Sequence, residues 1–155
     1  MFTKLIGATA GIVLSVAGAA SSNAEMATKF TLRVENITKP DAFTASNGVK
    51  WSLAFSPGTA VVHTDNAPVG AKGPGPITPG AAYETTISAM PGDRLSMTIM
   101  MGQSNDWFYA PAESGIELFK NGKVVSGDIT SQIMMWDAGT EVDQEPGIGS
   151  DQGPR

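Results

Sequence analysis

Short segments in which apolar and polar residues alternate are the feature that most limits what this chain can fold into. In "TKFTLRVENIT", residues 28–38, the apolar residues Phe30, Leu32 and Val34 are separated by polar ones, and 49–55 repeats the pattern. Alternation with a period of two is typical of a strand with one buried face. Other segments that we predict to be strands on this pattern, or as short apolar runs, lie at 59–63, 82–88, 94–101 and 128–136.

Glycine and proline separate these segments. Residues 67–80, "APVGAKGPGPITPG", carry one or the other at almost every second position, which predicts a long loop. Within 115–127, Asn121-Gly122 lies between apolar runs, and this dipeptide favours a tight β-hairpin turn because both residues tolerate positive φ. No segment shows a sustained helical period with capping residues. We therefore predict an all-β fold, an antiparallel β-sandwich.

The first 24 residues are typical of a secretory signal peptide rather than of a folded domain. Lys4 is their only charged residue, an apolar and small-residue stretch follows, and "SNA" at 22–24 offers a cleavage site. The apolar run is shorter than the roughly 20 residues of a membrane-spanning helix. We predict a leader at 1–24 that is removed on export, a domain at 25–155, and a secreted or periplasmic location without a membrane span after cleavage.

The composition limits the partners of the exported domain. The chain contains no cysteine, so disulfides cannot stabilise it. Its formal charge of −5 becomes −6 when the leader, with one lysine and no acid, is removed. Six acidic residues and one basic residue follow position 127. Because phosphate binding needs a basic surface, we expect no nucleic-acid partner, whereas a hard cation suits this charge.

An acidic loop follows the last predicted strand. In "IMMWDAGTEVDQEPG", residues 133–147, Asp137 and Glu141 stand four apart with Gly139 between them. Glycine lets the chain fold back, so the two carboxylates can meet on one ion, and calcium prefers oxygen ligands of this kind. Asp106 directly follows the strand at 94–101, and neighbouring antiparallel strands would bring it to the same end as Asp137. These residues alone leave two readings open: a metal site and a solvated acidic loop.

Other reactive groups give no support to an enzyme. His63 is the single histidine and ends a predicted strand, without a serine elbow motif elsewhere. The methionine clusters at 97–101 and 134–135 have no neighbouring histidine or cysteine, so we predict core packing rather than copper binding. A glycosidase with two carboxylates from Asp106, Glu113, Asp137 and Glu141 is a formal alternative, but about 130 residues leave little room for a substrate cleft.

Two acidic motifs carry a resemblance to a known family. "SNDWF" at 104–108, followed by "WDAGTE" at 136–141, resembles the spondin N-terminal domain of F-spondin, mindin and secreted bacterial proteins. "WSLAFSPGTAVVHTDNAPV" at 51–69 and the segment 137–155 resemble further parts of that domain, and the likeness covers essentially the whole mature chain.

The resemblance implies a sandwich similar to calcium-dependent lipid-binding domains, with calcium held in its apical loops by Asp106, Asp137 and Glu141. Animal members carry aspartate where this chain has Glu141. Bacterial members continue beyond "QGPR", so the likeness also predicts a domain truncated at its C-terminus.

By this analogy the protein is a secreted, non-enzymatic binding or adhesion module, and its partner is a cell-surface or matrix protein or a glycan. The alternatives are an exported structural domain without an ion site and the small carbohydrate-active enzyme.

Overall fold

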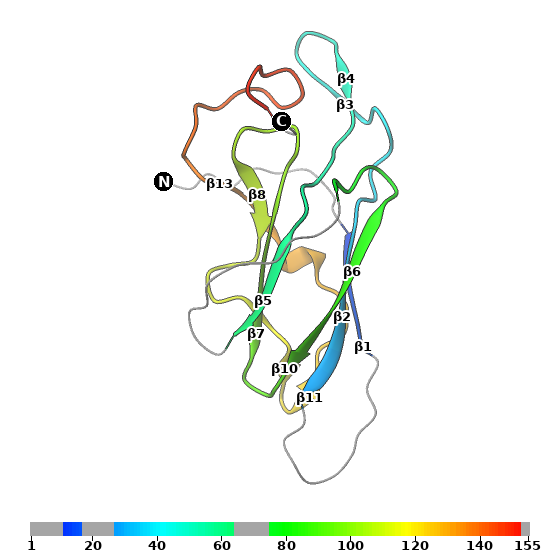
Figure 1. Ribbon diagram of the computed structural model, residues 1–155, viewed down its shortest axis with the longest axis vertical. Coiled ribbons are helices and arrows are strands. Elements are labelled where there is room, and N and C mark those ends of the chain that lie inside the picture. Colours follow the sequence, from blue (N-terminus) through cyan, green and yellow to red (C-terminus); the bar gives the residue numbers. More distant parts are fainter. Residues whose placement is uncertain (1–10, 17–26, 64–74, 153–155) are drawn as a thin grey trace.

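A computed structural model of the chain describes the backbone of residues 11–16 and all atoms of residues 27–63 and 75–152. Antiparallel strands dominate it (Figure 1). The elements are β1 (Gly11–Val16), β2 (Thr28–Glu35), β3 (Phe43–Thr44), β4 (Lys50–Trp51), β5 (Thr59–His63), β6 (Ala82–Ala89), β7 (Arg94–Met100), β8 (Trp107–Ala110), β9 (Ile116–Glu117), β10 (Phe119–Lys120), β11 (Lys123–Val124), β12 (Gly127–Asp128), the 3-10 helix η1 (Thr130–Gln132) and β13 (Met134–Asp137).

Two larger sheets are formed by these strands. One has the order β12-β1-β2-β6, and the other has the order β13-β8-β7-β5, with β9 also paired to β7. Two small ribbons, β3-β4 and β10-β11, lie at opposite ends of the molecule (Figure 1). The predicted all-β, antiparallel fold is confirmed, and the arrangement is sandwich-like.

One hydrophobic core is shared by both sheets. Phe30, Leu32 and Val34 of β2 are buried together with Leu95 and with the other alternate residues of β7. The polar residues between them lie on the outer faces, where their side chains reach water. The period of two in the sequence therefore corresponds to the inner and outer faces of the two sheets.

Strand β1 lies inside the segment that we predicted to be a cleaved leader outside the fold. In the full chain its backbone pairs antiparallel with β2 over six residues, from Gly11↔Glu35 to Val16↔Phe30, and with β12 over two. Removal of the leader remains a prediction, because this strand is a property of the uncut chain.

Individual segments agree with the sequence to different degrees. Asn121 and Gly122 have φ values of 51° and 70°, as expected for the hairpin between β10 and β11. The continuous strand expected over 128–136 is wrong, since the 3-10 helix η1 interrupts it. Within 49–55 only β4 is a regular strand, although Phe55 is fully buried and forms isolated bridges.

The long loop expected at 67–80 lies partly outside the described residues. In its described part, Ile77 is fully buried and bridges Phe55. Core packing is correct for Met97 and Met101, which are 6 % and 4 % exposed, and wrong for Met100, which is 44 % exposed.

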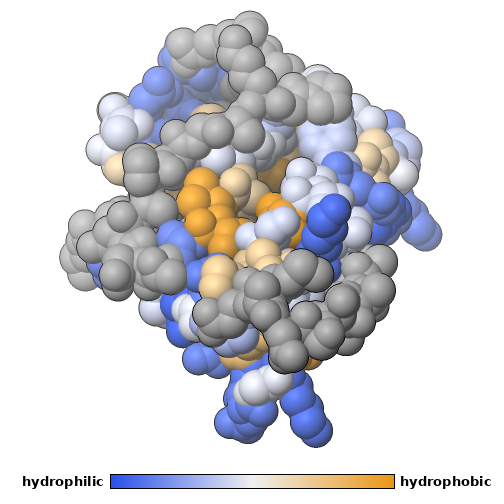
Figure 2. All heavy atoms as spheres, turned by 60° about the horizontal axis from the view of Figure 1, so that its bottom comes forward, coloured by the Kyte–Doolittle hydropathy of each residue, from blue (hydrophilic) through white to orange (hydrophobic). Residues whose placement is uncertain are grey.

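The two ends of the molecule differ in surface character. Seen from the end that carries the β10-β11 ribbon, apolar side chains gather near the centre of the face, among hydrophilic ones (Figure 2). Met90, after β6, and Val124, in β11, are 37 % and 38 % exposed. The opposite end carries the acidic segment that follows β13 (Figure 1). In the described part of the chain, no helix has the length and apolar character needed to cross a membrane.

Candidate metal site

Strand pairing brings Asp106 and Asp137 to the same end of one sheet. Asp137 is the last residue of β13 and pairs with Trp107, the first residue of β8. Asp106 directly precedes Trp107, and the carbonyl of Trp107 accepts a hydrogen bond from the N–H of Met101 (2.9 Å), so the connection from β7 is tight. The prediction that these two acids meet at one end of the fold is confirmed.

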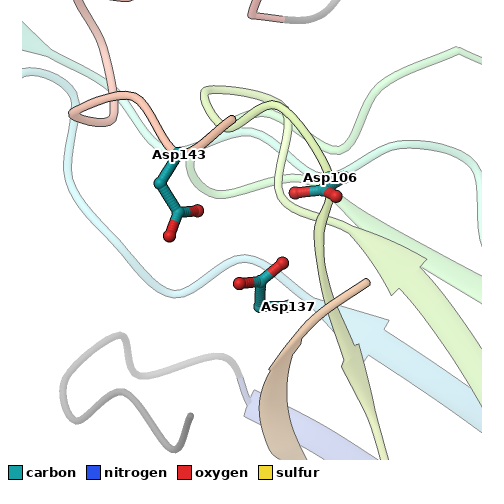
Figure 3. Close-up of side chains that lie close together, drawn as sticks. All are labelled: Asp106, Asp137 and Asp143. Carbon is teal, nitrogen blue, oxygen red and sulfur yellow. The ribbon is translucent and has the colours of Figure 1, made fainter. Parts of the chain in front are cut away.

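A third carboxylate, that of Asp143, completes the cluster. One oxygen from each of Asp106, Asp137 and Asp143 lies within 4.8 Å of the others. Figure 3 shows the three carboxylates facing a common space, with Asp143 contributed by the loop after β13. The indole N–H of Trp107 donates to Asp143 Oδ1 (3.0 Å) and holds that loop residue over the sheet end. The cluster could therefore hold a metal ion.

Asp106 is the buried member, and its two oxygens differ. Oδ2 accepts hydrogen bonds from the backbone N–H (2.7 Å) and hydroxyl (2.8 Å) of Thr140 and from the N–H of Glu141 (3.0 Å). Oδ1 is buried and has no hydrogen-bond partner, and the residue as a whole is only 6 % exposed. A buried carboxylate oxygen without a partner is energetically costly. A cation or a hydrogen-bond donor next to this atom would offset that cost.

The protonation state of Asp106 follows from the same contacts. Burial is the largest single influence and raises the pKa of its carboxyl. The hydrogen bonds that its carboxylate accepts from Thr140 and Glu141 outweigh burial and leave the pKa below its usual value. Asp106 is therefore negatively charged at neutral pH, beside two further carboxylates.

The other two carboxylates also use one oxygen for an internal contact. Asp137 Oδ1 accepts the N–H of Gly139 (2.7 Å), whose φ of 67° lets the chain turn back as the sequence predicted. Asp143 Oδ1 accepts the indole N–H of Trp107. Two oxygens bound to one calcium ion at about 2.3–2.6 Å can lie up to about 5 Å apart, so the observed spacing can be spanned by one ion.

The segment that follows β13 is tied down by contacts far apart in the sequence. The carboxylate of Glu145 accepts hydrogen bonds from the backbone N–H (2.6 Å) and the hydroxyl of Ser46, beside the β3-β4 ribbon. The N–H of Gly147 donates to the carbonyl of Gln103 (3.1 Å), and Gly147 lies against the ring of Trp51. These contacts fix the path of the loop that carries Asp143.

Glu141, the third ligand expected from the sequence, lies in this loop but is not one of the three clustered carboxylates. Its N–H donates to Asp106, and its residue is exposed. Sequence reasoning missed Asp143, which stands two residues later in the same acidic run. No signal in the sequence separates Glu141 from Asp143, because the choice depends on where the Trp107 side chain lies.

His63 lies at the other end of β7 from the carboxylates. Its Nε2 is 2.7 Å from the hydroxyl of Ser96, and it pairs across the strands with Arg94. The histidine therefore belongs to a different part of the sheet surface from the acidic cluster.

Comparisons with protein-family models, with curated proteins and with solved structures found no match to this chain. The resemblance to the spondin N-terminal domain consequently rests on the sequence motifs alone and stays a prediction.

Proposed function

We propose that this protein is an exported, non-enzymatic binding module in which Asp106, Asp137 and Asp143 hold a calcium ion. The observation that carries the proposal is Asp106 Oδ1, a buried carboxylate oxygen without a hydrogen-bond donor beside two more carboxylates. An all-oxygen, all-carboxylate ligand set favours hard cations over zinc or copper. A cation would neutralise most of the three like charges and satisfy the buried oxygen.

Export and adhesion are the wider parts of this proposal. The leader-like sequence at 1–24 supports export, and the likeness of "SNDWF" and "WDAGTE" to spondin domains supports adhesion to a cell-surface or matrix protein or glycan. Fold analogy alone does not transfer a partner, so the cation site is the part to test first.

The test is thermal unfolding and calorimetric titration of the protein in EDTA and then in millimolar calcium. A ligand that binds only the native state stabilises it by about 2.7 kcal/mol at a hundredfold excess over Kd. We expect an increase of several degrees in the unfolding temperature and saturable binding of one ion. A cooperative transition that does not move with calcium would leave the exported structural domain as the better account.

Single substitutions identify the ligands. Asp106→Asn, Asp137→Asn and Asp143→Asn should each remove most calcium binding, because each takes a charged ligand from the ion. Glu113→Gln removes one negative charge from an exposed residue outside the cluster and should leave binding unchanged.

Glu141→Gln tests whether Glu141 or Asp143 is the third ligand. A small effect of this variant and a large effect of Asp143→Asn would support the observed cluster. The reverse result would support the ligand set implied by the family resemblance and count against the cluster.

A further inference from the structure

The position of β1 in the four-stranded sheet is the starting observation. β1 lies between β2 and β12, and it is antiparallel to both. Figure 1 shows β1 beside β2. β2 pairs with β6 along its other side over eight residues, from Thr28↔Ala89 to Glu35↔Ala82. β1 is therefore the strand that satisfies the second side of β2 over most of its length.

Without β1, the backbone of β2 would be unpaired along one side. A strand edge presents N–H and C=O groups that can pair with any extended chain of matching length. β2 carries no proline, and its alternate residues Phe30, Leu32 and Val34 are buried in the core that both sheets share. Unpaired N–H and C=O groups of this edge would lie beside the hydrophobic core. Polar groups in apolar surroundings are costly unless they are hydrogen-bonded.

The register between β1 and β2 indicates which sequence pattern a strand beside β2 must have. Ile12, Leu14 and Val16 stand opposite Val34, Leu32 and Phe30, which are buried. Residues directly opposite each other in an antiparallel pair belong to the same face of the sheet. A fitting strand therefore has apolar residues at three alternate positions and runs antiparallel to β2.

The residues that alternate with those three stand opposite outward-facing residues of β2. Gly11, Val13 and Ser15 stand opposite Glu35, Arg33 and Thr31, which lie on the outer face of β2. Small or polar residues are thus tolerated at these positions of an incoming strand.

We propose that the place of β1 is a strand-acceptor site: once the leader is removed, an extended apolar segment of another polypeptide binds there, antiparallel to β2. This inference rests on the predicted cleavage of the leader but not on the cation site, which lies in other elements. Such a mode adds a strand to an exposed sheet edge, with backbone hydrogen bonds for affinity and alternate side chains for specificity.

The neighbour on the far side favours a free segment over a second copy of this chain. A strand in the place of β1 pairs with β2 on one side and with β12 on the other. The β2 strand of a second copy is already paired with its own β6, so it could satisfy β2 but not β12. An extended segment with both sides free satisfies both neighbours.

The experiment starts from the full chain with a specific protease site introduced after Ala24. After cutting, the freed leader is removed, and a fluorescent peptide of residues 9–18 is titrated in EDTA. The control peptide carries Leu14→Pro, since Leu14 pairs with both β2 and β12 and proline cannot donate to a strand ladder. We expect saturable binding of the native peptide, at least tenfold weaker binding of the control, and slower hydrogen exchange in β2.

Several results would overturn the proposal. They are the absence of peptide binding by cut protein that still melts cooperatively, equal binding of both peptides, and a dimer of cut protein that excludes the peptide. If the cut protein unfolds, recovery of a cooperative transition with the native peptide but not the control supports the proposal, and failure to recover overturns it. The same titration with Asp106→Asn should be unchanged, which separates this result from the fate of the cation site.

Discussion

The two main sheets differ in where their strands come from. The sheet β13-β8-β7-β5 with β9 takes its strands from residues 59–137, and the acidic cluster stands at one end of it. The sheet β12-β1-β2-β6 collects strands from residues 11–128 and has the leader segment as an inner strand. The first sheet is formed entirely by residues that follow the predicted leader, whereas the second includes a strand from the leader itself.

This difference suggests separate roles. The complete sheet provides a fixed support for three carboxylates, since Trp107 both starts β8 and contacts Asp143. Under our proposal, the other sheet accepts a strand of another polypeptide beside β2 once the leader is removed. Their shared core joins these roles, because residues of β2 and β7 pack in one cluster.

The largest expected loss of stability comes from substitutions in that shared core. Phe30→Ala in β2 and Leu95→Ala in β7 each remove a fully buried side chain, and each should lower the free energy of unfolding of the full chain by about 3–5 kcal/mol. Chemical denaturation followed by both tryptophan fluorescence and circular dichroism measures it. Two separate transitions in either variant would show that the sheets unfold independently, and this would contradict a single shared core.

A smaller loss of stability is expected from removing a hydrogen bond to Asp106 of the acidic cluster. Thr140→Val removes the hydroxyl that donates to Asp106 Oδ2 and should cost about 1–2 kcal/mol of unfolding free energy in EDTA. Thr86→Val, an exposed threonine of β6, is the matched control and should be nearly neutral. Equal losses in the two variants would mean that the hydroxyl contact contributes nothing specific.

Lowering the pH should reduce the free energy of unfolding. The folded-state pKa of Asp106 is lowered, so the carboxylate contributes stability that is present above its unfolded pKa and is lost as pH falls through the folded value. Hydrogen bonds from Thr130 and Ser46 lower the pKa values of Asp128 and Glu145 too, so several groups act in the same direction.

The contribution of Asp106 is isolated by a difference. Unfolding of the wild-type chain and of Asp106→Asn is measured in EDTA from pH 6 to pH 2. The stability of the wild-type chain should fall more steeply below about pH 4. Parallel curves would contradict the assigned role of this carboxylate.

The smallest effect is expected on the outer face of the other sheet. Arg33 of β2 forms ion pairs with Glu35 and Glu84 at 3.0 Å, all with substantially exposed side chains. Arg33→Ala should shift the unfolding midpoint by about a degree or less, because solvent and salt screen exposed pairs. A shift comparable to that of Thr140→Val would show that the outer face of β2 contributes more than its exposure suggests.

The sequence predicted some strands almost to the residue and others poorly. β2 and β7 lie where alternation placed them, since a half-buried strand needs an apolar residue at every second position. β5 and β6 lie at the other segments that we predicted to be strands. The segment 128–136 misled us because its apolar residues are equally compatible with a strand interrupted by a turn, which is what η1 makes.

At the candidate site, the sequence predicted carboxylate ligands and two of the three clustered positions. Carboxylates beside strand ends, with Gly139 to turn the chain, were enough to pair Asp106 with Asp137. That Asp143 joins them instead of Glu141 follows from contacts between distant parts of the chain. That choice depends on a Trp107 side chain 36 residues away and on contacts such as Glu145 with Ser46, 99 residues apart, and no local pattern contains such distances.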